Sequence, residues 1–284
     1  MTTVVVGTGY TGLRLLKQLP ADAALGLSRS VPPATAGRTV RELGLDDPPA
    51  TIAVPSPCRL LYTVPPANDA PGDRRLQAFL AALSTVPERI VYVSTTGVYG
   101  DHQGGVVTET TPVAPGNERA ARRVAAETLL AEWAEQHGSE VTILRVPGIY
   151  GPDRLMIEGI RGRSPLIDEA EASPGNRIHV DDLVTACLAA LDPGVPAGIY
   201  NVGDGDERSS TWFALEVARQ LGLEAPPIVS RKEAEATFSP MRLSFVRESR
   251  RVDTTKMREV LGLKPRYADA ADGIRASLEE MGLL

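Results

Sequence analysis

A glycine-rich hexapeptide near the start of the chain has the residue types and spacing of a phosphate-binding loop. It consists of Gly7, Thr8, Gly9, Tyr10, Thr11 and Gly12. The β-branched run Val4–Val6 precedes it, and leucines at helical spacing follow it, which is the context that such a loop requires. The first glycine permits a tight turn, the second admits a pyrophosphate close to the main chain, and the third lets helix and strand pack together. The pattern predicts a dinucleotide site; a glycine turn without a ligand is the alternative.

Residues after the next expected strand indicate which dinucleotide is bound. That strand ends at Leu27 and is followed by Ser28, Arg29 and Ser30, so no carboxylate is present to bind a ribose 2′-hydroxyl. Arg29 can instead pair with a 2′-phosphate, and both serines can donate hydrogen bonds to it. The sequence therefore predicts NADP in preference to NAD. The alternative is that Arg29 is only a solvated loop residue.

The rest of the pattern alternates β-branched runs with amphipathic stretches, which predicts a parallel sheet with helices on both faces. Expected strands are Val4–Val6, Ala23–Leu27, Leu60–Val64, Arg89–Val93, Val141–Val146 and Gly198–Val202. Expected helices are Leu76–Leu83, Asn117–Gln136, Val180–Leu191 and Thr211–Leu221, with another starting at Leu13. Val64, Pro65 and Pro147, where two of these strands end, are expected to line the cofactor. The fold class is α/β: a Rossmann-type doubly wound parallel sheet with a small C-terminal substrate lobe.

The composition of the chain and the lengths of its segments limit the classes of protein, the domain division and the binding partners that we expect. The chain has 284 residues, 43% hydrophobic and 23% charged, which excludes a collagen or a disordered chain. Residues 31–57 show no clear period, and past Gly148 the segments become short. We expect a dinucleotide-binding domain at 1–150 and mixed segments including a smaller substrate-binding lobe at 151–284. The net charge of −6 argues against nucleic acid, and no apolar run is long enough for a membrane. Two distant cysteines and three scattered histidines predict no metal site, and the cytoplasm is the expected compartment.

Five blocks spread over nearly the whole chain carry a distinctive pattern. They are Val91–Gly100, Leu144–Pro152, Arg177–Leu183, Ile199–Val202 and Lys256–Leu263. Together they resemble the extended short-chain dehydrogenase/reductase superfamily, of the NAD(P)-dependent epimerase/dehydratase type. The resemblance implies a nicotinamide cofactor, a small-molecule substrate, and a catalytic set made of a Ser or Thr after the fifth strand and a Tyr-x-x-x-Lys pair on the next helix.

That catalytic set is only partly present. The resemblance places Thr95 at the Ser/Thr position, Arg119 at the position of the tyrosine and Arg123 at that of the lysine. No Tyr-x-x-x-Lys occurs anywhere in the sequence. The chain therefore resembles the atypical branch of the superfamily, which keeps the fold but lacks the tyrosine.

An arginine cannot replace the tyrosine in proton transfer, because its pKa exceeds about 12. Arg119 can polarise a carbonyl or clamp an anionic group, and Arg123 can hold ribose hydroxyls; a solvated helix face is the alternative. Tyr99 and Tyr150 follow strand ends, where parallel sheets bind ligands, and are the candidate proton donors. Packing beneath the loops is the alternative for both tyrosines. Thr95 can donate a hydrogen bond to a substrate oxygen.

Two functions remain open. The first is an NADP-dependent oxidoreductase, or an epimerase or dehydratase, acting on a small polar molecule. The second is a catalytically inactive NADP(H)-binding sensor. The resemblance places two groups of arginines near the substrate, which would favour an anionic substrate; solvated basic loops are the alternative. They are Arg154, Arg161 and Arg163, and then Arg242, Arg247, Arg250 and Arg251. The resemblance also predicts a homodimer through the alanine-rich helix 117–136.

Overall fold

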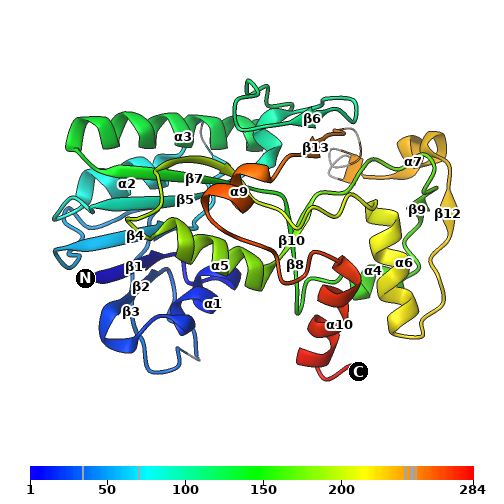
Figure 1. The fold of residues 1–284 in the computed structure, drawn as a ribbon, viewed down its shortest axis with the longest axis horizontal. Helices are drawn as coiled ribbons and strands as arrows, with labels where there is room; N and C mark the ends of the chain where they lie inside the picture. Colours follow the sequence, from blue (N-terminus) through cyan, green and yellow to red (C-terminus); the bar gives the residue numbers. More distant parts are fainter. Residues whose placement is uncertain (34, 70, 240–241, 244–245, 247) are drawn as a thin grey trace.

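A parallel sheet of seven strands forms the centre of the molecule in this computed structural model (Figure 1). The structure describes residues 1–284 except 34, 70, 240–241, 244–245 and 247. From one edge to the other, the strands are β11 (Gly198–Asn201), β7 (Glu140–Val146), β5 (Arg89–Thr95), β4 (Cys58–Tyr62), β1 (Thr2–Val6), β2 (Ala24–Ser28) and β3 (Thr39–Glu42). The strand order reverses between β1 and β4, the type of switch point at which open parallel sheets bind ligands. The predicted Rossmann-type fold is confirmed.

Side chains of the central strands alternate between two buried faces. In β1, Val5 belongs to the hydrophobic cluster on one face, and Val4 and Val6 belong to the cluster on the other. In β5, Val91 lies on the first face and Tyr92 on the second. A strand that is covered on both sides has no polar face. This is why the sequence shows continuous apolar runs here instead of an apolar–polar alternation.

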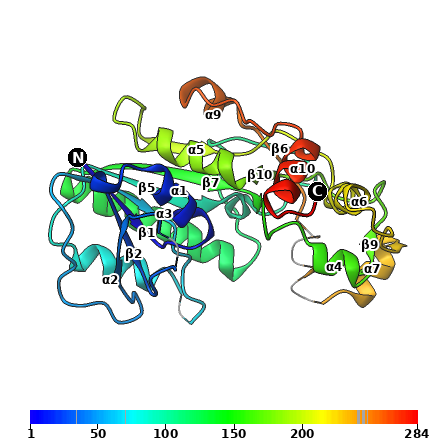
Figure 2. The same ribbon diagram turned by 90° about the horizontal axis from the view of Figure 1, so that it is seen from below.

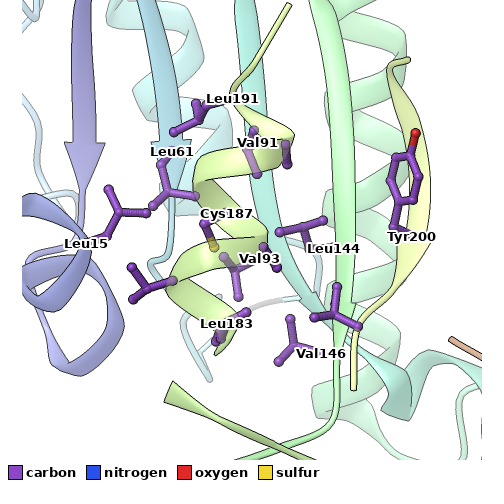
Figure 3. Packing of buried hydrophobic residues seen from close by; sticks show 14 of the residues in the cluster. Leu15, Leu61, Val91, Val93, Leu144, Val146, Leu183, Cys187, Leu191 and Tyr200 are labelled. Carbon is purple, nitrogen blue, oxygen red and sulfur yellow. The ribbon is translucent and has the colours of Figure 1, made fainter. Parts of the chain in front are cut away.

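Two pairs of helices cover these faces. They are α1 (Tyr10–Gln18) and α5 (Val180–Ala190) on the first face, and α2 (Arg74–Ala82) and α3 (Glu118–His137) on the second. On the first face, Leu183 and Cys187 of α5 pack in one cluster with Val93 and Leu144 of the sheet (Figure 3). Among the described residues, no helix is both long enough and apolar enough to cross a membrane.

The structure adds β3 to the expected strands of the large sheet, and the sheet unit continues past residue 150. Strand β3 lies within the stretch 31–57, and its side chains are exposed or half-buried, so no apolar run marks it in the sequence. Helix α5 and strand β11 follow residue 150, yet both belong to the large sheet and its covering layer. A boundary at residue 150 therefore does not coincide with the end of the sheet unit.

A smaller lobe lies at the end of the molecule away from the N-terminus (Figure 2). Its elements are β8 (Gly148–Tyr150) paired with β10 (Arg177–His179), β9 (Leu166–Ile167) paired with β12 (Ile228–Val229), and the helices α4 (Ile157–Arg161), α6 (Ser210–Gln220), α7 (Arg231–Thr237) and α10 (Ala270–Glu280). Phe213, Ile274 and Leu278 belong to a hydrophobic cluster of its own. The expected C-terminal lobe is therefore present, with a separate core.

Three further elements connect the lobe to the sheet. They are β6 (Val106–Val107), β13 (Arg251–Val252) and α9 (Thr255–Val260). Because β6 pairs with β13, the loop that follows β5 is tied to the chain that leaves the lobe. This connection brings the segment around residue 250 to the carboxyl ends of the sheet strands.

A buried ion pair joins α3 to β7 at the same end of the sheet. Arg145 Nη2 donates to Glu127 Oε2 at 2.7 Å, and the two side chains are 5% and 7% exposed. Ser94 of β5 donates to the other carboxylate oxygen of Glu127 at 2.5 Å. The Arg145 guanidinium also lies over the ring of Tyr99, 4.9 Å from its centroid. These groups are out of water, so removing one leaves its partner unpaired.

We predict that Arg145→Met lowers the free energy of unfolding by about 3–5 kcal/mol, because it leaves the Glu127 carboxylate buried without a counter-charge. Urea unfolding followed by circular dichroism measures this change. Arg161→Met is the matched control: Arg161 is 52% exposed in a surface pair with Glu158, and we expect a change within about 0.5 kcal/mol. An Arg145→Met protein as stable as the wild type would show that the pair does not hold helix and sheet together.

Candidate functional site

The glycine loop between β1 and α1 has the geometry that a bound diphosphate requires. Gly7 has a φ of +92°, in the region that favours glycine. A Cβ on Gly12 would lie 2.0 Å from the carbonyl oxygen of Gly7, so the helix and the turn can touch only through glycines. A Cβ on Gly9 would meet nothing within 4 Å. Gly9 therefore marks the open side, from which a ligand can reach the main chain.

Polar groups of this loop are available to a ligand. No side chain caps the first turn of α1 at Gly9, so the first N–H groups of the helix can bind an anion. The Thr8 hydroxyl is buried and has no hydrogen-bond partner among the described residues. A buried hydroxyl left in this state costs about 1–3 kcal/mol. The phosphates of a nicotinamide dinucleotide fit this arrangement, because their oxygens would accept from both kinds of donor.

The residues expected to line the cofactor surround the loop. Thr63 Oγ1 donates to the carbonyl of Gly7 at 2.7 Å, and a Cβ on Gly7 would lie 2.8 Å from Val64 Cγ2. Val64 therefore packs directly against the turn, while Pro65 beside it is exposed. Their contact with a cofactor stays a prediction.

The end of β2 carries a positive charge in solvent. Ser28 is half-buried, and Arg29 and Ser30 are exposed. The pKa of Asp46 is lowered chiefly by a hydrogen bond from Arg75, with a smaller contribution from the charge of Arg29. Arg75 binds Asp46 at 2.7 Å. Asp46 therefore has an arginine partner other than Arg29, and Arg29 is exposed where a phosphate could reach it.

A cavity of about 680 Å³ lies between the carboxyl ends of β5 and β7 and the lobe. The described residues that line it from the sheet side include Thr95, Thr96, Gly97, Asn117, Arg119 and Pro147, and β8 of the lobe adds Gly148, Ile149 and Tyr150. Those from the lobe side include Arg154, Met156, Leu166, Ile167, Asn176, Arg177, Thr211, Phe213, Phe238, Arg242, Glu248 and Arg250. Of the predicted site residues, the cavity brings together Thr95, Arg119, Pro147 and Tyr150.

Thr95 and Arg119 reach this cavity from the sheet unit. Thr95 Oγ1 accepts a hydrogen bond from the N–H of Gly97 at 3.1 Å and thereby caps the short helix η2 (Thr96–Tyr99). The hydroxyl proton of Thr95 can still be donated to a ligand oxygen. Arg119 stands in the first turn of α3 and is exposed. An anionic ligand would gain both from its guanidinium and from the positive end of the helix.

Arg123 lies one turn further along α3, and its side chain contacts strand β5. Its Nη1 donates to the Tyr92 hydroxyl and to the Val93 carbonyl, both at 2.9 Å. These contacts hold α3 against the second half of β5. Arg123 is not among the described residues that line the cavity. Whether Arg123 also holds ribose hydroxyls stays a prediction.

The structure places the hydroxyls of both candidate tyrosines inside the protein. Tyr99 is fully buried, and its hydroxyl donates to Asn201 Oδ1 at 2.6 Å. Only the ring of Tyr150 borders the cavity, because its hydroxyl is enclosed, has no hydrogen-bond partner among the described residues, and packs against Gly273 of α10. Burial raises the pKa of both phenols. This placement favours the packing interpretation over proton donation.

Tyr10 and Arg154 lie where the glycine loop meets the lobe. The Tyr10 hydroxyl donates to the carbonyl of Pro152 at 2.8 Å, and the Arg154 guanidinium lies 4.0 Å from the centroid of the Tyr10 ring. Burial raises the pKa of Tyr10 to about 12. Because Arg154 also lines the cavity, this pair connects the cofactor loop with the candidate substrate site.

A buried polar cluster lies behind the cavity wall. The side chains of Tyr150, Arg177 and Asp204 each have a buried polar atom without a hydrogen-bond partner among the described residues. Arg177 Nη1 lies 3.4 Å from Asp206 Oδ1 as an ion pair. Burial raises the pKa of Asp204 to about 7. The main chain links the two acidic and basic parts of the cluster, since the N–H of Asp204 donates to the carbonyl of Arg177 at 2.9 Å.

His179, in one of the matching blocks, is structural. It caps α5, since its Nδ1 accepts from the N–H of Asp181 at 3.2 Å. Asp181 itself pairs with Arg14 of α1 at 2.5 Å. Burial lowers the pKa of His179 to about 4, so the ring is neutral. Among the described residues, no group of three His, Cys, Asp or Glu side chains could hold a metal ion.

Glu248 is the functional candidate that the sequence pattern missed. Its Oε1 accepts from Asn117 Nδ2 at 3.0 Å and its Oε2 from Arg250 Nη1 at 2.9 Å. Among the described residues that line the cavity, it is the sole carboxylate. Asn117 and Glu248 are 131 residues apart, so nothing local in the sequence pairs them. Several arginines were expected to favour an anionic substrate. Of these, Arg242 and Arg250 also line the cavity, and Arg247 lies outside the described residues.

Comparison with known proteins connects this site to one family. Residues 68–203 match the model of the NAD dependent epimerase/dehydratase family. The chain is 30% identical over 203 residues to UDP-glucose 4-epimerase of Mycolicibacterium smegmatis, covering 67% of this chain and 61% of that protein. It is 34% identical over 173 residues to Protein YeeZ of Escherichia coli, covering 59% and 60%. The chain thus matches about three fifths of the length of these curated relatives.

Solved structures extend the likeness over the whole chain. A functionally unknown conserved protein from Silicibacter pomeroyi superimposes with a TM-score of 0.81 at 29% identity, covering 98% of both chains. MoeE5 in complex with UDP-glucose and NAD gives a TM-score of 0.74 at 20% identity, covering 99% of both chains. At that identity the second likeness establishes the fold alone.

Proposed function

Because this chain belongs to the NAD-dependent epimerase/dehydratase family, we propose that it is an NADP-dependent oxidoreductase acting on a small anionic molecule. The observation behind this proposal is the open glycine loop, which Tyr10 and Arg154 connect to a cavity of about 680 Å³. Five arginines line that cavity, against one glutamate among the described lining residues. This balance supports a substrate that carries negative charge.

The residues that would hold the cofactor are those of the loop and the strand ends beside it. A bound nicotinamide would supply or accept a hydride. The first N–H groups of α1 and the Thr8 hydroxyl would bind the phosphates. Val64 would pack beside the loop, and Arg29 would pair with a 2′-phosphate, to which Ser28 and Ser30 would donate.

Thr95 and Glu248 are the groups that we propose act on the substrate. The Thr95 hydroxyl donates a hydrogen bond to the reacting oxygen, and Arg119 adds positive charge at the same wall. The Glu248 carboxylate exchanges the proton, a role for which a positioned carboxylate suffices. Asn117 and Arg250 hold this carboxylate from two sides.

One observation favours a second candidate, an NADP(H)-binding sensor without a reaction. Among the described residues, neither Tyr99 nor Tyr150 presents a hydroxyl to the cavity. A protein that binds the cofactor and only reports its presence needs no proton donor.

Arg29→Ala should weaken NADPH binding by about 10- to 100-fold and leave NADH binding unchanged, because one charge-assisted contact to the 2′-phosphate is lost. Fluorescence titrations of the two cofactors measure this. The matched control is Arg74→Ala, whose guanidinium is 53% exposed beside Asp69. The structural neighbour MoeE5 was solved with NAD, so the comparison with NADH is needed. If the wild type binds NADH as tightly as NADPH or more tightly, the proposed preference for NADP is wrong.

Glu248→Gln should slow single-turnover oxidation of bound NADPH by about 100-fold or more: the carbonyl oxygen takes up a proton when its carbon receives the hydride, and an amide cannot supply the proton that the Glu248 carboxyl would give. The assay uses a panel of carbonyl compounds and sugar nucleotides. Tyr99→Phe serves as the comparison, since its hydroxyl bonds to Asn201 in the interior, and we expect a rate within about twofold of the wild type. Tight NADPH binding without turnover of any compound would establish the sensor instead.

We also propose that the chain forms a homodimer through α3. Ala120 and Ala126 face the protein's own core, whereas Ala121 and Ala125 are exposed one turn apart on the outer side. Small side chains at this spacing let a second helix approach closely.

Ala125→Glu should convert this dimer to a monomer, because it places a charge in the interface. Light scattering after gel filtration measures the mass. Ala236→Glu, the same change at an exposed position of α7 in the lobe, is the control. A wild-type protein that is monomeric at tens of micromolar would refute the dimer.

A further inference from the structure

The hydrogen-bonding side chains of the cavity are largely used within the protein. Asn117 and Asn176 each donate with the nitrogen and accept with the oxygen of the amide in contacts to other parts of the chain. The Thr211 hydroxyl donates to the carbonyl of Ile167 at 2.7 Å. A ligand with many hydroxyl groups depends on side chains like these being available. These three side chains therefore have little capacity left to bind the hydroxyl groups of a sugar ring.

Apolar side chains form much of the lobe wall. Ile149, Leu166, Ile167, Phe213 and Phe238 all line the cavity, and Phe213 belongs to the hydrophobic cluster of the lobe. Apolar surface of this kind gains from covering hydrocarbon, at about 25 cal/mol for each Å² removed from water. The wall thus suits a ligand with an aliphatic or aromatic body.

The arginines of the lobe wall differ in their partners. Arg177 pairs with Asp206, and Arg250 pairs with Glu248. Arg242 donates to the carbonyl of Pro165, and its guanidinium lies 3.6 Å from the centroid of the Phe238 ring. Among the described residues, no carboxylate forms an ion pair with Arg242.

Arg242 is a half-buried cation in an apolar wall. Burial lowers its pKa, and among the described residues no negative charge offsets this effect. A partly desolvated guanidinium without a counter-ion is stabilised by an anion that enters with its ligand. The charge of Arg242 matches one negative charge on a ligand, for which a carboxylate is the simplest group.

We propose that the substrate of this cavity is an amphipathic organic acid, whose carboxylate pairs with Arg242 and whose apolar body lies against Leu166, Ile167 and Phe213. The inference rests on the proposed function, because it names the substrate class of the same site. It separates this chain from relatives whose names refer to sugar nucleotides, because the lobe wall offers apolar surface together with the charge of Arg242.

Calorimetric titration of two probes tests the proposal. The first is 6-phenylhexanoate, and the second is its neutral counterpart 6-phenylhexan-1-ol; both are titrated into the protein with and without NADP⁺. We expect the acid to bind at least tenfold more tightly than the alcohol, because about one charge-assisted hydrogen bond contributes a difference in affinity of that size. UDP-glucose should fail to displace the acid.

Three variants assign the two parts of the interaction. Arg242→Gln should weaken the acid by about tenfold or more and leave the alcohol unchanged. Leu166→Ala should weaken both probes by a similar factor of about five, because it removes apolar contact alone. Arg161→Gln is the control: Arg161 is exposed on α4 of the same lobe, pairs with Glu158 and is not among the described lining residues, and it should change neither probe. Thermal unfolding confirms that each variant is folded.

Equal binding of acid and alcohol, no effect of Arg242→Gln, or displacement of the acid by UDP-glucose would each overturn the inference. The control titration with NADP⁺ separates this result from the proposed function. If NADP⁺ binds while the probes show none of the expected differences, the substrate class alone is wrong. If the probes behave as expected but NADP⁺ does not bind, the oxidoreductase proposal fails and the acid site stands.

Discussion

The buried pair of Glu127 and Arg145 fixes the part of the molecule on which the candidate site depends. It joins α3 to β7, and through Ser94 it also reaches β5. The next residue after Ser94 is Thr95, and Pro147 follows Arg145 by two positions, so the pair sets where both reach the cavity. Two charges taken out of water are costly unless each keeps its partner. A rigid arrangement of two strand ends and one helix is the consequence.

The cofactor loop relies on a different and more local constraint. A side chain at position 12 would collide with the main chain of Gly7, whereas one at Gly9 would meet open space. These requirements involve residues close together in the sequence, and for that reason the loop, its strand and its helix could be predicted from the pattern alone. The apolar runs of the parallel strands are local in the same sense, because both faces of the sheet are covered.

The cavity could not be predicted in this way, because its parts come from distant segments. Glu248 meets Asn117 across 131 residues, and only the pairing of β6 with β13 brings that segment to the sheet. The orientation of the two tyrosine side chains could not be predicted either, although both residues lie in recognisable positions after strand ends. A tyrosine that follows a strand end can face the ligand or turn inward, and the local sequence is the same for both. Packing decides: Tyr99 turns toward Asn201, and the hydroxyl of Tyr150 toward Gly273.

Arg119 and Arg123 stand at the positions of α3 where the resemblance predicts a tyrosine and a lysine in relatives, and the structure gives them different surroundings. Arg123 is drawn into the protein by the hydroxyl of Tyr92 and the carbonyl of Val93, so this turn of α3 serves the packing of the helix. Arg119 brings positive charge to the cavity but no proton that can be exchanged near neutral pH. In our proposal the proton transfer therefore involves the opposite wall, where the chain that leaves the lobe places Glu248 between Asn117 and Arg250. The lobe would then both close the cavity and supply the group that exchanges the proton.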